Sequence, residues 1–102
     1  MRRRRMSDLF DQAVTFVRSP KYIEITPRQL AIMGVAMSER YPMRVRDMAM
    51  SLNVSKPVVS RAVAALEGHG FVERRRGEDG RDRFIVVTDA GVAFRRSIGG
   101  LA

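Results

Sequence analysis

The residues of this sequence that are best suited to a chemical role are cationic and hydroxyl side chains, which bind anions. A first group begins the helical pattern at residues 55–67 and projects away from its apolar positions: Ser55, Lys56, Pro57, Ser60 and Arg61. A helix N-terminus exposes backbone N–H groups and the positive end of the helix dipole, and both favour a phosphate. Ser60 and Arg61 carry donors that can reach base edges, and the guanidinium fork of Arg61 matches guanine. Ser55 is equally suited by type and position to cap the helix.

A second group of arginines surrounds the stretch Gly77-Glu78-Asp79-Gly80 and consists of Arg74, Arg75, Arg76, Arg81 and Arg83. A basic hairpin of this kind can follow the DNA backbone and insert an arginine into the minor groove. We expect Asp79 to brace Arg81, two residues away, through an ion pair. Because residues 73–83 hold five Arg and four acidic residues, the run taken alone is more typical of a solvated hairpin.

Candidates for catalysis and metal binding are few. His69, the only histidine, lies between two glycines at the end of a helical pattern, where a surface or capping role fits better than chemistry. The chain has no Cys, and carboxylates such as Asp8, Asp11 and Asp47 are dispersed without ligand spacing. The seven Met fall mostly at core spacing and are expected to pack rather than to bind metal. We expect no enzymatic activity, no metal and no cofactor.

The composition favours one small basic domain. The chain has 102 residues, with 19 Lys or Arg against 11 Asp or Glu and a formal net charge of +8. This charge favours a polyanionic partner, which is DNA, RNA or an anionic membrane surface. The longest apolar run, at residues 30–37, is far shorter than the ~20 residues that span a bilayer. The absence of Cys is compatible with a reducing compartment such as the cytoplasm.

The first six residues form a separate basic segment. Met1–Arg5 is similar to the start of a signal peptide, but polar Ser7 and Asp8 follow where an apolar stretch is required, so we expect no export. Residues 1–6 are expected to be a disordered arm that adds nonspecific phosphate contacts. A membrane-surface role fits less well, because the helix that follows has acidic residues in place of a basic face. Met6 is an alternative start of the chain, in which case the arginine run is not native.

Residues 7–102 are expected to form a single domain. Helical periodicity predicts a first helix that Ser7 caps and that Ser19-Pro20 ends. Thr26 and Gln29 form the capping box of a second helix, which is expected to end at Tyr41-Pro42. The apolar positions expected to face inward on this second helix are Leu30, Met33, Gly34 and Met37.

The second half of the domain divides into further elements, expected at residues 43–45 (a minimal strand), 46–52 and 55–67 (helices), 71–75 and 83–87 (the strands of a hairpin), and 88–98 (a last helix). This order is that of a winged helix, with a helix-turn-helix at 46–67 and a wing at 71–87. The predicted fold class is therefore mainly α with a small β-hairpin (α+β), in the form of a winged helix-turn-helix.

Residues 46–67 meet the requirements of a helix-turn-helix in one frame. Ala49 supplies the small residue on which the second helix packs, and Asn53 is one of the few non-Gly types that readily adopt positive φ. The expected apolar anchors are Met48, Leu52, Val54, Val59, Ala62, Val63 and Leu66. An ordinary helical hairpin is the alternative interpretation of this segment.

The stretch from about Ile25 to Ile98 resembles the MarR family of winged-helix transcriptional regulators. The matching segments are ITPRQL at 25–30, VSKPVVSR at 54–61, LE at 66–67, GFVER at 70–74, EDGR at 78–81 and VTDAG at 87–91. The resemblance implies sequence-specific binding to double-stranded DNA. It places Ser55, Pro57, Ser60 and Arg61 on the recognition helix, and Asp79 and Arg81 on the D-x-R tip of the wing.

The family's dimer is formed by long helices at both ends of the chain, and here the last helix has room for only about ten residues. The chain is expected to form a homodimer, for which Leu9, Phe10, Phe16 or Phe94 could supply the contacts, and a monomer is the alternative. The expected function is transcription regulation on the nucleoid in a bacterial cytoplasm, with no effector identified. The alternative is an architectural or protein-interaction winged helix with little sequence specificity.

Overall fold

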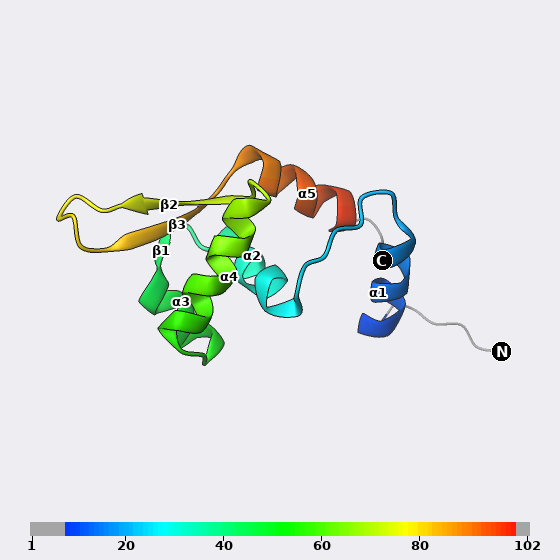
Figure 1. Cartoon of the computed structure of the whole chain (residues 1–102), viewed down its shortest axis with the longest axis horizontal. Coiled ribbons are helices and arrows are strands. Elements are labelled where there is room, and N and C mark those ends of the chain that lie inside the picture. Colours follow the sequence, from blue (N-terminus) through cyan, green and yellow to red (C-terminus); the bar gives the residue numbers. More distant parts are fainter. Residues whose placement is uncertain (1–7, 100–102) are drawn as a thin grey trace.

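The computed structural model describes residues 8–99, which form five helices and a small antiparallel sheet. In chain order the elements are α1 (Leu9–Arg18), α2 (Pro27–Ser38), β1 (Met43–Arg44), α3 (Val45–Leu52), α4 (Lys56–Gly68), β2 (Val72–Arg76), β3 (Arg83–Val87) and α5 (Asp89–Gly99). Helices α2, α3 and α4 lie on one side of the sheet, and the β2–β3 hairpin projects beyond them (Figure 1). This arrangement confirms the predicted winged helix-turn-helix. None of the described helices is long and apolar enough to cross a membrane.

Capping side chains fix where α1 and α2 begin. Thr26 and Gln29 form the predicted capping box of α2, with Gln29 N donating to Thr26 Oγ1 at 3.0 Å. α2 ends at Ser38, before the predicted stop at Tyr41-Pro42. The cap of α1 is Asp8, whose carboxylate accepts from Asp11 N at 2.9 Å. The predicted cap Ser7 lies outside the described residues.

The turn between α3 and α4 has the predicted left-handed residue. Asn53 has φ 58° and ψ 46°, and among the described residues it alone of the non-glycines has positive φ. Ala49 is buried, and its carbonyl accepts from Val54 N at 3.0 Å, which closes the turn. The predicted anchors pack into or against one core, with Val59, Val63, Leu66 and Met48 fully buried. The segment is therefore a helix-turn-helix, as predicted.

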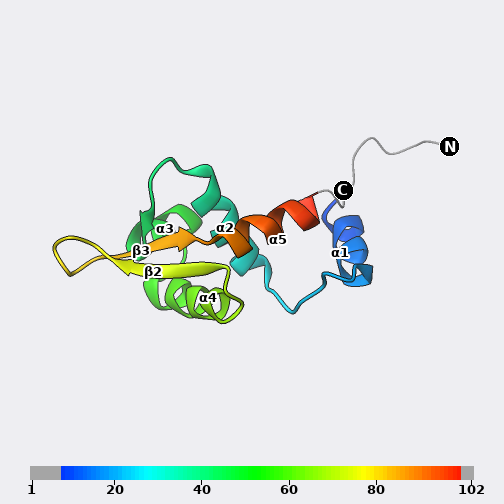
Figure 2. The ribbon, with the colours of Figure 1, turned by 90° about the horizontal axis from the view of Figure 1, so that it is seen from above.

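The sheet joins the wing to the start of the helix-turn-helix. Its strand order is β1-β3-β2, and both pairings are antiparallel. β1 pairs with β3 through Met43↔Ile85 and Arg44↔Phe84, so α3 starts directly from the strand next to the wing. The wing turn is closed by Gly77 N donating to the Asp82 carbonyl at 3.0 Å. Figure 2 shows the resulting hairpin lying above α4.

Two expectations about the core are corrected. Ile32 is fully buried although it is outside the predicted stripe of α2, and Met37 is only half-buried and lies outside the core cluster. The reason is that α2 contacts both α4 and β3, so it buries more than one narrow face. Met50, which was expected to pack, has 79% of its surface exposed on α3.

Aromatic rings connect α5 to the rest of the fold. Phe94 is 8% exposed and stacks on Phe71 with ring centroids 4.5 Å apart, while Phe16 meets it edge-on. Phe94 is therefore a core residue, which corrects its expected availability for dimer contacts. α1 itself has no buried residue, and Leu9 and Phe10 are exposed by 73% and 80%. In both ribbon views α1 lies at the opposite end of the molecule from the wing tip (Figures 1 and 2).

Candidate nucleic-acid interface

The N-terminus of α4 is exposed and capped. The Ser55 hydroxyl accepts from Val58 N at 3.4 Å, so the side chain serves as the helix cap, as its type and position allowed. Lys56 and Pro57 follow in the first turn and are exposed. A capped N-terminus still presents its remaining first-turn N–H groups to solvent. This end of α4 therefore retains the features that favour an anion.

A cleft of about 480 Å³ separates the first half of α4 from the wing. Its lining contains six cationic side chains and a single carboxylate, and consists of Arg44, Val45, Arg46, Lys56, Pro57, Ser60, Arg74, Arg81, Asp82 and Arg83. These residues come from β1, α3, α4, β2, the wing turn and the start of β3, so only the folded chain brings them together. A concave surface lined by one sign of charge concentrates ions of the opposite sign. The charge and shape of the cleft therefore favour a polyanion.

Arg74 and Ser60, which were predicted as separate DNA contacts, bond to each other. Arg74 Nη1 donates to Ser60 Oγ at 3.1 Å, and Arg74 Nε and Nη2 donate to Glu67 Oε1 at 3.1 and 2.8 Å. The backbone N–H of Arg74 donates to Glu67 Oε2 at 3.2 Å. All these groups are half-buried. Most of the hydrogen-bond donors of Arg74 therefore bind side chains of α4.

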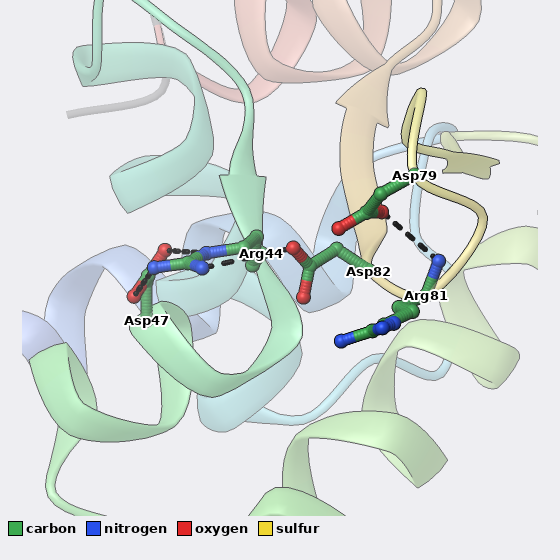
Figure 3. A network of polar contacts seen from close by, with 5 residues as sticks. All are labelled: Arg44, Asp47, Asp79, Arg81 and Asp82. Carbon is green, nitrogen blue, oxygen red and sulfur yellow. Dashed lines mark hydrogen bonds and ion pairs between the residues drawn. The ribbon is translucent and has the colours of Figure 1, made fainter.

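Arg44 forms a second polar network at the other side of the cleft (Figure 3). Its Nε and Nη2 donate to the two carboxylate oxygens of Asp47 at 2.8 and 3.1 Å. Its Nη1 lies 3.7 Å from Asp82 Oδ2, at the base of the wing turn. Sequence reasoning missed Arg44, Glu67 and Asp82 because each pairs with a residue from another element. For Glu67 the available signal was a charge opposite to that of Arg74 across the turn between α4 and β2, which is too common to single it out. For Arg44 and Asp82, which α3, α4 and β2 separate in the sequence, there was no such signal.

The wing tip differs from expectation in one contact. Asp79 Oδ1 accepts from the backbone N of Arg81 at 3.0 Å, and no ion pair joins the two side chains within residues 8–99. The backbone N–H groups of Arg81 and Asp82 lower the pKa of Asp79. The predicted ion pair is therefore wrong, and Asp79 shapes the turn instead. The Arg81 side chain stays exposed and lines the cleft.

The remaining predicted residues fall outside this cleft. Arg75 pairs with Glu73 of its own strand at 3.0 Å, and Arg76 is exposed near the tip. Arg61 is exposed on the other flank of α4, beside a smaller hollow of about 190 Å³ that Arg28 also lines. A helix seated in a groove presents both flanks to DNA. The two cationic flanks of α4 are compatible with that placement.

The ion pair between Glu67 and Arg74 predicts a pH effect on stability. Arg74 holds the pKa of Glu67 below its usual value of 4.5, mainly through the side-chain hydrogen bond. A carboxylate with a lowered folded pKa stabilises the fold above its unfolded pKa, and this stability is lost as the pH falls through the folded pKa. Between pH 7 and pH 3 the free energy of unfolding should therefore fall less in Glu67→Gln than in the unmodified chain. We expect a difference of up to about 1 kcal/mol, because solvent screens a partly exposed ion pair. Urea unfolding between pH 3 and pH 7, in steps of about one unit, measures this, and parallel curves for the two proteins would contradict it.

These elements define a class: a winged helix with a basic cleft between its recognition-type helix and its wing. A MarR family model matches residues 25–82, and the chain belongs to the MarR family. One curated relative is an uncharacterized HTH-type transcriptional regulator, YwoH, of Bacillus subtilis (strain 168), which is 43% identical over 47 residues. That match covers 46% of this chain and 34% of YwoH.

Solved structures share the fold at low sequence identity. RV1404 from Mycobacterium tuberculosis has a TM-score of 0.77 at 18% identity, with 91% of this chain and 62% of that chain covered. The transcriptional repressor CouR, bound to a 23-mer DNA duplex, has a TM-score of 0.77 at 22% identity, with 90% of this chain and 62% of that chain covered. The chain therefore spans about a third of the curated relative and less than two thirds of these structures.

Proposed function

We propose that this chain binds double-stranded DNA sequence-specifically and regulates transcription. Helix α4 would lie in the major groove, while the wing would follow the backbone and reach the minor groove. The observation that carries this proposal is the cleft, where six cationic side chains converge between α4 and the wing. Membership of the MarR family supports it, as does the shared fold of CouR, which is bound to a DNA duplex.

The residues divide into three roles under this proposal. Arg61 reads base edges from α4, and Lys56 and the N-terminus of α4 contact phosphates. Arg81 reaches the minor groove from the wing tip. The other exposed wing arginines, Arg75, Arg76 and Arg83, contact the backbone. No step of this function requires chemistry from the protein.

We further propose a homodimer on a pseudo-palindromic site, in a bacterial cytoplasm. An exposed apolar stripe on α1 supports this, formed by Leu9, Phe10, Val14 and Val17. Exposed apolar side chains on one face of a helix are typical of a surface that binds another protein. The commonest assembly of identical chains is a dimer with two-fold symmetry. Light scattering on the purified chain measures the assembly, and a monomer at micromolar concentration would contradict it.

Sequence specificity is tested with DNA selected from a random library. A specific regulator should bind the selected duplex at least about 10³-fold more tightly than a random duplex at the same salt concentration. Fluorescence anisotropy with both duplexes measures the ratio. Equal affinities would contradict the proposal and favour an architectural winged helix with little sequence specificity.

Arg61→Ala tests the assigned reading face. We expect a loss of roughly 1–3 kcal/mol in binding to the selected duplex, concentrated at one or two base positions. Binding to a panel of single-base variants of the selected duplex measures this. Arg95→Ala is the matched control, because Arg95 is an exposed arginine on α5 and does not line the cleft. Normal binding of Arg61→Ala to every duplex would place the reading face elsewhere.

A further inference from the structure

Two carboxylates are paired with arginines that line the cleft. Asp82 lines the cleft, and Glu67 holds Arg74, which lines it too. A carboxylate near DNA phosphates is repelled, so charge alone disfavours both residues on this surface. Each of them, however, joins two elements whose relative position decides whether α4 and the wing reach DNA together.

Glu67 and Ser60 form one side of an inner brace, defined here as Ser60, Glu67 and Arg74. Ser60 and Glu67 are seven residues apart on α4, which is about two turns, so they share one face of the helix. Arg74 of β2 lies along that face and donates to both. Its backbone N–H also donates to Glu67. A single arginine thus holds β2 against two points on α4. These two contacts fix the angle between the strand and the helix as well as the distance between them.

Arg44 and Asp82 form an outer brace. Arg44 is the residue before α3, and Asp47 of α3 holds its guanidinium at two points (Figure 3). The remaining nitrogen faces Asp82, the residue before β3. The outer brace therefore connects the helix-turn-helix to the turn that carries Arg81. In Figure 3 Arg81 lies beside Asp82 on this turn.

We propose that Glu67 and Asp82 are positioning residues for DNA recognition: they fix the angle between α4 and the wing so that Arg61 and Arg81 meet one duplex in register. This inference rests on the proposed function. Partly exposed ion pairs contribute little to global stability. Their main effect here is on geometry, because the β2–β3 hairpin extends past the helices that would otherwise hold it.

The test uses Glu67→Ala and Asp82→Ala in the full chain, with the selected duplex and a random 30-base-pair duplex as probes. Each variant removes a negative charge, so binding to the random duplex should stay the same or increase slightly. Binding to the selected duplex should decrease about tenfold, the range of coupling between contacting residues. The ratio of the two affinities is the readout, because a general loss of folding would weaken both.

The matched controls are Glu73→Ala and Glu78→Ala. Among residues 8–99 the ion pair of Glu73 is with Arg75 of the same strand, and Glu78 is exposed in the wing turn, so both variants change the charge without releasing a brace. Both should bind the selected duplex at least as tightly as the unmodified chain. If Glu67→Ala and Asp82→Ala behave like these controls, the two carboxylates do not fix the angle between α4 and the wing. Tighter binding of Glu67→Ala to both duplexes would show that Arg74 contacts DNA directly once freed, which also overturns the proposal.

A measurement without DNA separates this inference from the proposed function. The Arg74 Nε–H signal in ¹H–¹⁵N NMR should exchange slowly with water in the unmodified chain and rapidly in Glu67→Ala. Arg76, which is exposed on the same strand, is the internal reference. If the unmodified chain does not prefer the selected duplex, the proposed function fails. If Arg74 exchanges as fast as Arg76 in the unmodified chain, the inner brace fails whatever the DNA result.

Discussion

Gly91→Ala is expected to destabilise the fold by at least about 1–3 kcal/mol, the typical result of forcing an extra methyl group into a packed site. A Cβ at this buried glycine would lie 2.3 Å from the Phe71 carbonyl oxygen and 2.8 Å from Val87 Cγ1. The closer obstacle is backbone, and it is fixed because Thr88 N donates to the same oxygen at 2.9 Å. α5 could make room only by moving off Phe71, which would separate the stacked rings of Phe71 and Phe94.

Thermal and urea unfolding measure this loss, which corresponds to a Tm lower by roughly 4–8 °C for each kcal/mol. Gly34→Ala is the matched control, because Gly34 lies within α2 and a Cβ there meets nothing within 4 Å. It should raise stability by up to about 1 kcal/mol through helix propensity. A Gly91→Ala protein as stable as the unmodified chain would show that the packing of α5 is not tight.

The parts of the fold that could be predicted are those fixed by local rules. The Thr26 capping box and the left-handed Asn53 turn depend on residues within four positions of each other, and both formed as predicted. The inward face of α2 could not be predicted in full. Ile32 is buried because α2 lies between α4 and the sheet, and only tertiary packing decides how wide a face is covered.

The same distinction applies to the candidate site. The spacing of the sequence placed Lys56 and Arg61 on the exposed side of α4, where the structure also has them. It could not show that Arg74 turns inward, because the acceptor Glu67 lies across the turn between α4 and β2. Arginines that are equivalent by composition thus differ in function once the chain folds. Arg81 remains available to a ligand, while Arg74 is bonded to the protein.

The largest expected effect on DNA binding is that of Lys56→Glu combined with Arg81→Glu. The two residues line the cleft from α4 and from the wing, so the change reverses charge on both of its sides. Like charges brought together in an interface cost several kcal/mol, so we expect affinity for any duplex to fall by about 10²-fold or more. The slope of log affinity against log salt should decrease by about two, because two cations that neutralise the charge of the duplex are lost.

Arg95→Glu combined with Arg96→Glu separates the cleft from the net charge. Both arginines are exposed on α5 and neither lines the cleft, yet the double variant carries the same net charge as the first. If the cleft binds DNA, this control should lose far less affinity and keep its salt slope, since screening limits the reach of exposed charges to about 8–10 Å. Equal losses in the two double variants would mean that DNA responds to the total charge of the chain. Binding would then be independent of the angle between α4 and the wing, and the +8 charge would explain it without a defined site.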